Sequence, residues 1–402
     1  MIRTVLTLAG ASLVLAAPLA AQDTVQRAPT TEADALSKAR AIGNRGRSVR
    51  KFYPPKYDLS GLPAYAPQTR VAGTIRQWGN NYLKDSGLMA VWEAEFRRFH
   101  PRIRFADNLY SSSVGFPGLI SGAADIAPMG RQALWDELKG FEREGAAGGE
   151  EGVGQTEIVE IVMATGSFDV RGWSYALGIF VHKDNPIAGL TMEQLDGILG
   201  GRRDGGWKDL TWDTSVARGP EKNIRTWGQL GLTGEWADRP ITVYGYNSKY
   251  HFNDEIDKKV LAGSGKWNED MRAYSNVAGL KADGSLTAAG ELITNGVAAD
   301  RYGLAYTGKP FENPNVRLVP LSRGPGQPFV PLELDRVQDR TYPLLRDVYY
   351  YFRREKGKPV DPKVREFLRY VLSREGQAAI QADGKYLPLT PELARQQLAK
   401  LD

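Results

Sequence analysis

Short continuous apolar runs alternate with apolar positions at helical spacing along the chain from about residue 69. Residues 71–75 form a run typical of a strand, and residues 84–100 then place apolar side chains on one face of a helix. The apolar positions of that helix are Leu88, Val91, Trp92, Phe96 and Phe99. The same order recurs through residues 102–144, and strands that alternate with helices predict mostly parallel sheets with helices on their faces.

Two later helices carry clear boundary signals. Thr191 and Gln194 fit a capping box, in which the two side chains satisfy backbone N–H groups at the start of a helix. The stretch from Asp361 to Gly384 predicts one long helix, which the aspartate caps and the glycine ends. Between these helices, residues 342–354 predict a long strand.

Three loops between a strand and a helix are suited to holding an anion. They span residues 76–82, 110–115 and 244–254, and they contain serine and asparagine side chains. The first N–H groups of a helix have no partner inside the helix, and the helix dipole favours negative charge there. Hydroxyl and amide side chains add further donors. Because ligands bind at the carboxyl ends of parallel strands, these loops are expected to form one site.

Each loop also has a purely structural interpretation. Residues 111–113 could simply cap the helix that follows them, Trp78 could pack in the core, and Asn80 could occupy a turn. Residues 247–249 could likewise supply a cap and a solvated charge. A binding role is favoured by the presence of three such loops in one alternating chain.

The composition is that of a soluble globular protein. The chain has 402 residues, of which 42% are hydrophobic and 25% charged, and this length suggests two or three domains. The formal charge of +5 favours anionic partners. Lysine and arginine form no run dense enough to indicate nucleic-acid binding.

The start of the chain, residues 1–21, predicts a secretory signal peptide. Arg3 precedes an apolar stretch over residues 5–17 that is too short to span a membrane, and cleavage is expected after Ala21. The chain has no cysteine, which excludes a lipid anchor on cysteine, disulfides and thiol chemistry. We therefore expect a soluble periplasmic protein, with residues 22–68 forming an extended arm that lies on the body or tethers it.

The histidines and the known catalytic motifs give little support for an enzyme. His100 is expected at the surface, His182 lies at the end of a strand, and His251 alone lies in a candidate loop, where it could act as a base toward a serine. The chain has neither a G-x-S-x-G elbow nor an H-E-x-x-H motif. No cluster of cysteine and histidine suits a transition metal. We expect no catalysis, no metal and no cofactor.

Several stretches resemble the periplasmic phosphate-binding proteins of the high-affinity phosphate ABC transporter. The stretches are "ADIAPMGR", "VHKDNPIAGLTMEQLDGIL", "TWGQLGLTGEWADRPITVYGYNS", "YGLAYTG", "YPLLRDVYYYF" and "REFLRYVLSREGQAAIQADGKYLPL". The resemblance covers roughly residues 71–389 and implies the α/β, two-lobed type 2 periplasmic binding protein fold, in which each lobe is a mostly parallel sheet flanked by helices. The divisions it implies are lobe 1 at residues 69–173 and 313–402, lobe 2 at residues 174–312, and two hinge crossovers near residues 172–175 and 310–314.

The resemblance also implies a ligand-binding set, since in this family phosphate lies between the lobes. The corresponding residues are Thr74, Trp78, Gly79, Asn80, Ser111, Ser112, Ser113, Gly115, Gly130, Arg131, Asn247, Ser248 and Lys249. The implied partners are inorganic phosphate or a similar oxyanion and the membrane permease of an ABC transporter. The family implies a monomer that closes on its ligand and then docks on the permease.

The loop of the second lobe departs from the family's pattern. Relatives carry an arginine and a Ser-Gly-Thr trio there, whereas this chain has Tyr246 in place of the arginine and residues 250–252 in place of the trio. A bidentate arginine is hard to replace for a tetrahedral dianion, so Lys249 or Arg131 would have to supply the charge. Three functions stay open: phosphate capture for a transporter, binding of another oxyanion or small polar solute on the same fold, and a ligand-free role as a cell-envelope scaffold.

Overall fold

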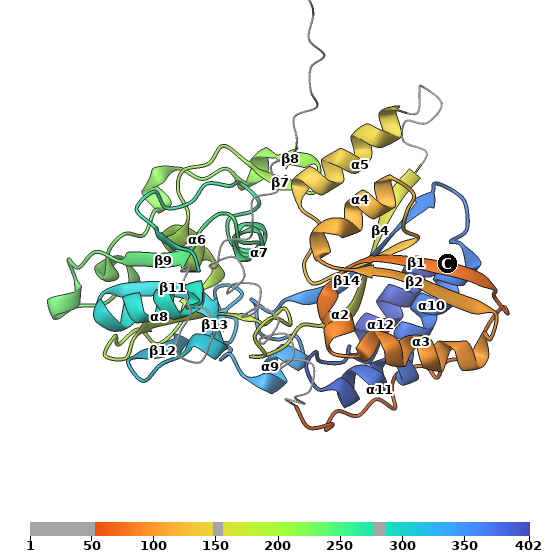
Figure 1. Ribbon diagram of the computed structural model, residues 1–402. Coiled ribbons are helices and arrows are strands. Elements are labelled where there is room, and N and C mark those ends of the chain that lie inside the picture. Colours follow the sequence, from red (N-terminus) through yellow and green to blue (C-terminus); the bar gives the residue numbers. More distant parts are fainter. Residues whose placement is uncertain (1–52, 148–155, 277–286) are drawn as a thin grey trace, which may run out of the picture.

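The computed structural model describes residues 53–147, 156–276 and 287–402, which form two lobes side by side (Figure 1). The expected signal peptide and residues 22–52 of the expected arm lie outside the described residues. The first lobe is built on a five-stranded sheet with the order β2-β1-β3-β14-β4. Its strands are β1 (Gly73–Gly79), β2 (Ile103–Leu109), β3 (Ile126–Met129), β4 (Thr156–Thr165) and β14 (Asp347–Glu355).

The second lobe is built on another five-stranded sheet, with the order β10-β9-β11-β5-β12. Its strands are β5 (Leu177–His182), β9 (Thr242–Tyr246), β10 (Arg272–Tyr274), β11 (Gly303–Gly308) and β12 (Val316–Val319). Two further pairs of short strands are β6 (Leu190–Thr191) with β13 (Leu321–Ser322), and β7 (Gly206–Lys208) with β8 (Thr211–Asp213). The expectation of two α/β lobes is confirmed.

Helices cover both faces of the first sheet, with α4 and α5 on one side and the remaining helices of that lobe on the other (Figure 1). The helices of the first lobe are α2 (Asn81–Asp85), α3 (Leu88–Phe99), α4 (Gly115–Ile120), α5 (Trp135–Ala147), α10 (Pro362–Val371), α11 (Arg374–Asp383) and α12 (Pro391–Leu398). The others are α6 (Met192–Leu199), α7 (Phe252–Lys259), α8 (Ala289–Ala299) and α9 (Leu334–Gln338). Short 3-10 helices are η1 (Ser112–Val114), η2 (Thr214–Val216), η3 (Pro220–Lys222), η4 (Trp227–Leu230), η5 (Gly234–Trp236), η6 (Lys309–Phe311) and η7 (Ala399–Leu401).

Each sheet combines parallel and antiparallel pairs of strands. In the first sheet, β1 is parallel to β2 and β3, whereas β14 is antiparallel to both β3 and β4. In the second, β9 is parallel to β10 and β11, whereas β5 is antiparallel to β11 and β12. The local alternation of strand and helix predicts the parallel part of each sheet, and the antiparallel part belongs to the strands that border the crossovers between the lobes.

The chain crosses between the lobes twice. It first passes from β4 to β5 through residues 166–176, a segment that includes the residues 172–175 expected for this crossover. The return comes later than expected, because β12 is hydrogen-bonded to β5 and therefore belongs to the second lobe. The chain thus returns through residues 320–346 rather than near residues 310–314, and the expected lobe boundary at residue 313 is wrong for the same reason.

The stretch from Asp361 to Gly384 forms two helices instead of the expected single one. Helix α10 ends at Val371, and Ser373 begins the next helix by accepting a hydrogen bond from the Gly376 N–H at 3.3 Å. A serine in this position favours a new cap over a continuing helix, since its hydroxyl competes for backbone N–H groups. The predicted ends at Asp361 and Gly384 are both confirmed.

Aromatic side chains fill the core of the first lobe. Trp92 on α3 is fully buried and donates a hydrogen bond from Nε1 to the Gly376 carbonyl at 2.9 Å. Phe96 and Tyr350 are also fully buried, and they come from α3 and β14 respectively. Burial of side chains this large stabilises the lobe by roughly 2–3 kcal/mol each. The core therefore joins the early and late parts of the chain.

The described part of the expected arm, residues 53–68, lies along the first lobe. The Tyr53 N–H donates to the Gly384 carbonyl at 2.9 Å, and the Arg374 N–H donates to the Pro63 carbonyl at 2.8 Å. These contacts bind the arm to both ends of helix α11. Within the described residues, the structure contains no helix that is both long and apolar enough to cross a membrane.

His100 is buried in the first lobe, and the expectation of a surface position is wrong. Its Nδ1 accepts a hydrogen bond from the Val71 N–H at 3.3 Å, and its Nε2 lies 2.7 Å from the Tyr65 hydroxyl. That hydroxyl donates to Glu366 at 2.8 Å, so the neutral imidazole with its proton on Nε2 completes the chain of hydrogen bonds. In the sequence, His100 stands at the end of a helix and before a proline. This local pattern does not indicate that the arm packs over the histidine.

The stability of the protein is expected to fall as the pH drops below about 6.5, partly because of His100. Burial lowers the pKa of His100 below its ordinary value, while Glu366 acts in the opposite direction and Arg70 adds to the decrease. The unfolded chain therefore takes up this proton first, and protonation favours unfolding. Urea denaturation at pH 7 and pH 5 should show a smaller loss of stability for His100→Gln than for the unchanged protein. An equal loss in both would show that other groups cause the acid sensitivity.

Candidate functional site

The serine loop, residues 110–115, lies against the end of β3. Ser111 caps η1 by accepting the Ser113 N–H at 3.2 Å. Ser112 Oγ accepts the Gly130 N–H at 3.1 Å, which ties the loop to the residue that follows β3. Ser113 is exposed. The loop is thus held at the carboxyl edge of the first sheet, where the sequence placed it.

Gly79 and Gly115 allow two loops to approach β3 closely. A Cβ atom at Gly79 would lie 2.0 Å from the Pro128 carbonyl oxygen, and one at Gly115 would lie 3.1 Å from Ala127 Cβ. A larger residue would displace either loop from the sheet. In this structure both glycines therefore allow the loops to pack closely against β3.

Thr74 does not lie with the loops at the carboxyl edge, and Trp78, at the carboxyl end of β1, turns its side chain toward α4. Trp78 is half-buried and packs against the core, with its side chain close to Gly118 on α4. Thr74 is exposed near the start of β1, five residues before Gly79, which places it about 16 Å away along the strand. The structure therefore does not bring Thr74 to the candidate site, because it lies at the amino end of its strand.

Two polar side chains, those of Asn80 and Ser174, meet next to Gly130. Asn80 is buried, caps α2, and donates from Nδ2 to the Tyr386 hydroxyl at 3.3 Å. Ser174, in the first crossover, donates to the Gly130 carbonyl at 2.6 Å. A Cβ atom at Gly130 would lie 3.0 Å from Asn80 Nδ2 and 3.2 Å from Ser174 Oγ, so the three residues are in close contact. Ser174 was not among the residues predicted to bind the ligand, since it stands outside the three loops.

Arg131 already has a partner of opposite charge. Its guanidinium makes two hydrogen bonds of 2.7 Å to the two carboxylate oxygens of Glu137 in the first turn of α5. The pair is largely buried, which favours its persistence because breaking it would leave an unpaired charge. Arg131 is thus poorly placed to replace the family's arginine.

The second-lobe residues Asn247, Ser248 and Lys249 form a turn that faces solvent. Asn247 donates from its N–H to the Tyr274 carbonyl at 2.8 Å, and its Oδ1 accepts the Lys249 N–H at 3.1 Å. Ser248 and Lys249 are exposed, and Lys249 Nζ lies 5.4 Å from the centre of the Tyr250 ring. These contacts all lie within the second lobe.

Tyr246, which stands where relatives carry the arginine, is buried in the second lobe. Its hydroxyl lies 2.6 Å from Thr307 Oγ1 and 3.3 Å from the Tyr175 hydroxyl. Burial raises the pKa of Tyr246, so the phenol stays neutral. Its carbonyl accepts a hydrogen bond from Asn253 Nδ2 at 2.9 Å. Tyr246 is thus part of the lobe's core and brings no positive charge.

Helix α7 lies on the side of the second lobe that faces the first lobe (Figure 1). Lys258 donates from Nζ to the Ala133 carbonyl of the first lobe at 2.6 Å. Lys259 donates to the Leu345 carbonyl in the second crossover segment. Next to these contacts, the ring centres of Trp135 on α5 and Trp207 on β7 lie 5.3 Å apart. The two lobes are therefore in contact on this side of the cleft.

His251 stands just before α7, where the positive charges of Arg346 and Arg131 act on it. The residue is exposed, but the protein around the ring partly desolvates it and lowers its pKa, and the charges of Arg346 and Arg131 add to the decrease. The imidazole is consequently neutral at ordinary pH and can donate or accept a hydrogen bond. Its ring stacks on Phe252 at 4.9 Å. The position of His251 in a candidate loop was recognised in the sequence, but its two cationic neighbours were not.

Arg346 is the residue that the sequence analysis missed. It precedes β14, and its side chain is only 2% exposed. Its guanidinium lies 5.0 Å from the centre of the Phe252 ring, and Nε lies 3.6 Å from a Glu255 oxygen. Nε and Nη2 have no hydrogen-bond partner among the described residues. In the sequence, Arg346 could have been recognised as a charged residue inside the apolar stretch of residues 342–352, where a buried arginine is unusual.

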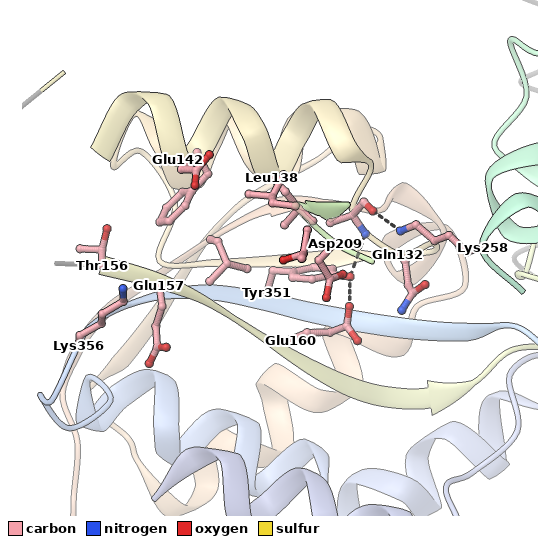
Figure 2. Close-up of a pocket in the computed structure, with 15 residues that line it drawn as sticks. Gln132, Leu138, Glu142, Thr156, Glu157, Glu160, Asp209, Lys258, Tyr351 and Lys356 are labelled. Carbon is pink, nitrogen blue, oxygen red and sulfur yellow. Dashed lines mark hydrogen bonds between the residues drawn. The ribbon is translucent and has the colours of Figure 1, made fainter. Parts of the chain in front are cut away.

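A cavity of about 670 Å³ lies beside α5, with walls from both lobes (Figure 2). It is lined by Gln132, Ala133, Leu138, Phe141, Glu142, Thr156, Glu157, Ile158, Glu160, Asp209, Leu210, Thr211, Lys258, Tyr351 and Lys356. The Tyr351 hydroxyl donates to Glu160 at 2.5 Å, and burial raises the pKa of Glu160. None of the residues predicted to bind the ligand lines this cavity.

The charges around this cavity do not favour an anion. Its walls include four carboxylates, from Glu142, Glu157, Glu160 and Asp209, but only two lysines. Among the described residues, buried guanidinium nitrogens without a hydrogen-bond partner belong to Arg218, Arg346, Arg365 and Arg369, and of these Arg346 lies in the second crossover segment. In the described part of the chain, no group of three or more His, Cys, Asp or Glu side chains could hold a metal ion.

Comparisons with known proteins give consistent matches over most of the chain. Residues 90–375 match the family described as a PBP superfamily domain. The chain is 31% identical over 340 residues to a protein of Pseudomonas aeruginosa named phosphate-binding protein PstS, covering 85% of this chain and 90% of the relative. It is 22% identical over 298 residues to Protein SphX of Synechococcus elongatus, covering 73% of this chain and 72% of that protein.

A solved structure of an ABC-type phosphate transport receptor from Vibrio cholerae is also similar. The sequence identity is 16% and the TM-score is 0.45, over 79% of this chain and 100% of that chain.

Proposed function

This chain belongs to the PBP superfamily and to the family of the phosphate-binding protein PstS, and from this premise we propose that it captures phosphate between its two lobes. The observation that carries the proposal is the 31% identity, over 85% of the chain, to a relative named as a phosphate-binding protein. The name of that relative describes binding rather than catalysis, in agreement with the expectation that the chain is not an enzyme.

The proposed donors from the first lobe are the hydroxyls of Ser112 and Ser113, because the Val114 N–H already donates to the Ser111 carbonyl at 3.1 Å. The placement of Ser112 supports this part of the proposal, since its hydroxyl is fixed beside Gly130 at the edge of the sheet. Several neutral donors can hold an oxyanion because each bond to the charged group is stronger than a bond between neutral partners. Asn80, at the same edge, belongs to the proposed set as well.

The proposed donors from the second lobe are Asn247, Ser248 and Lys249. Because their turn faces solvent, they would reach a bound anion only through movement of the second lobe toward the first. A ligand that bridges the two lobes stabilises the closed form through its higher affinity for that form. The closed protein would then dock on the permease of an ABC transporter, acting as a monomer in the periplasm without a lipid anchor.

Isothermal titration of the purified protein with phosphate, and with sulfate as a control ligand, tests the proposal. We expect phosphate to bind and sulfate to be ignored. Alanine at Ser112 is expected to weaken phosphate binding about tenfold, because a hydrogen bond to a charged group is lost. Ser121→Ala is a matched control, since Ser121 ends α4 and its hydroxyl donates only to carbonyls of that helix.

Each departure from this result has a distinct meaning. Binding of sulfate or another small solute in place of phosphate would favour the same fold with a different ligand. If no oxyanion gave a heat of binding, the result would contradict the proposal and favour a ligand-free role as a cell-envelope scaffold. Equal affinity of the Ser112→Ala variant and the unchanged protein would show that the serine loop does not contact phosphate.

A further inference from the structure

We infer that Arg346 is the guanidinium that holds the anion, in place of the arginine that relatives carry at the position of Tyr246. The inference rests on the proposed function, because it names the residue that supplies the positive charge at the proposed site. It differs from the expectations for Lys249 and Arg131, which were the candidates in the sequence.

Arg346 has hydrogen-bond donors that lack partners among the described residues. A guanidinium carries five N–H donors in a planar fork that matches two oxygens of an anion. At 2% exposure the side chain has little access to water, and Nε and Nη2 have no hydrogen-bond partner among the described residues. Buried charged donors are normally paired, since an unpaired one is costly. Bound phosphate would provide acceptors for these donors.

Arg346 shares an acidic neighbour, Glu255, with a second cation. Glu255 Oε2 lies 3.6 Å from Arg346 Nε, but Glu255 Oε1 also lies 2.8 Å from Lys259 Nζ. Although burial acts to raise its pKa, the charges of Lys259 and Arg346 lower the pKa of Glu255, which is therefore ionised. Two positive charges thus face one negative charge, and an anion would balance the remaining charge.

Arg346 lies where the two lobes meet. Its carbonyl accepts the Gly166 N–H of the first crossover at 2.8 Å, so its backbone is fixed where the two crossover segments meet. Its side chain meets Phe252 and Glu255 of α7 in the second lobe. A group at the crossovers moves little when hinged lobes close, so the same arginine can face the ligand in open and closed forms.

The other arginine and lysine candidates lack these features. Arg131 is bound through both of its terminal nitrogens to Glu137, and Lys249 is exposed beside the ring of Tyr250. Neutral His251 lies near Arg346 and would add a hydrogen bond rather than a charge. Arg346 is thus the buried cation in this region whose donors remain available.

Phosphate titration of Arg346→Gln and Arg346→Lys tests the inference. We expect the glutamine variant to bind phosphate about 100-fold more weakly, because a charged bidentate interaction is lost. The lysine variant keeps the positive charge but lacks the planar fork of donors. Its affinity for phosphate is expected to lie between those of the unchanged protein and the glutamine variant. Arg353→Gln is the matched control, since Arg353 lies on β14, is exposed, and gives the same change in net charge. Thermal unfolding of each variant checks that it is folded.

Glu255→Gln gives a second test that does not depend on removing Arg346. If Glu255 competes with the anion for Arg346, loss of its charge should strengthen phosphate binding several-fold. If Arg346 serves only as a structural partner of Glu255, the same change should leave the affinity unchanged or weaken it. The direction of this effect separates the two roles even where the Arg346 variants are poorly folded.

The outcomes for the proposed function and for Arg346 are distinguishable. Failure of the unchanged protein to bind phosphate would overturn both. Phosphate binding by the unchanged protein, together with equal affinity of a folded Arg346→Gln variant, would overturn the role of Arg346 alone. Weaker binding of Arg346→Gln and stronger binding of Glu255→Gln would support it.

Discussion

Alanine at Gly166 is expected to destabilise the protein by about 3 kcal/mol or more and to weaken phosphate binding as well. A Cβ atom at this position would lie 2.2 Å from the Ser174 carbonyl oxygen and 2.6 Å from the Arg346 carbonyl oxygen. Both contacts are to backbone, so no flexible side chain can move aside. The two crossover segments would have to separate, and Arg346 would be displaced from the region where the lobes meet.

Urea denaturation and phosphate titration of Gly166→Ala measure the two effects. Gly324→Ala is the matched control, because a Cβ atom there would meet no other atom within 4 Å. Unchanged stability of Gly166→Ala would mean that the crossovers can separate at little cost. Loss of stability with full phosphate affinity would mean that the position of Arg346 does not depend on this contact.

Leucine at Gln377 is expected to cost about 3–5 kcal/mol of stability, because several buried hydrogen bonds are lost together. The amide is fully buried, and Nε2 donates to the Met163 carbonyl at 3.0 Å and to the Val371 carbonyl at 2.8 Å. Its Oε1 accepts the Leu389 N–H at 2.8 Å. A leucine of similar volume would leave these backbone groups without partners.

Guanidinium chloride denaturation of Gln377→Leu checks this value. Gln396→Leu is a suitable control, since Gln396 lies on the exposed side of α12 and bonds only to Glu392 of the same helix. A cost below about 1 kcal/mol would mean that the backbone relaxes to new partners or to water. The larger effect at Gln377 would identify the "SREGQ" stretch as a structural element of the first lobe.

The elements that could be predicted from the sequence are those set by local interactions. The capping box of α6 is present, with the Thr191 and Gln194 side chains each bound to the other's backbone N–H at 3.0 Å or less. The alternation of strands with helices likewise predicted the two α/β lobes. Such features depend on residues that are close in sequence, so their pattern is visible without the fold.

The elements that could not be predicted depend on contacts between distant residues. The place of β12 in the second sheet follows from its pairing with β5, and the burial of His100 follows from the arm and Glu366. Neither contact has a local signature. Thr74 was expected near the end of a strand over residues 71–75, but β1 continues to Gly79, so its distance from the carboxyl edge depends on where β1 ends.

The candidate site shows the same division. The serine loop and Asn80 lie at the edge expected for loops that follow parallel strands, and whether they bind phosphate stays a prediction. The source of positive charge was sought in the loops themselves, at Arg131 and Lys249. Arg346 was overlooked because its stretch predicts a buried strand, and only the crossover geometry places it between the lobes.

The position of β14 bears on the order in which the lobes can form during synthesis. The strands of the second sheet all come from residues 177–319, so that lobe can assemble from one continuous stretch of chain. The first sheet instead receives β14, from residues 347–355, between β3 and β4. Contacts this distant in sequence form slowly and require both segments to be present. The N-terminal lobe therefore has to wait for nearly the whole chain to be made, and the lobe encoded in the middle can be complete before it.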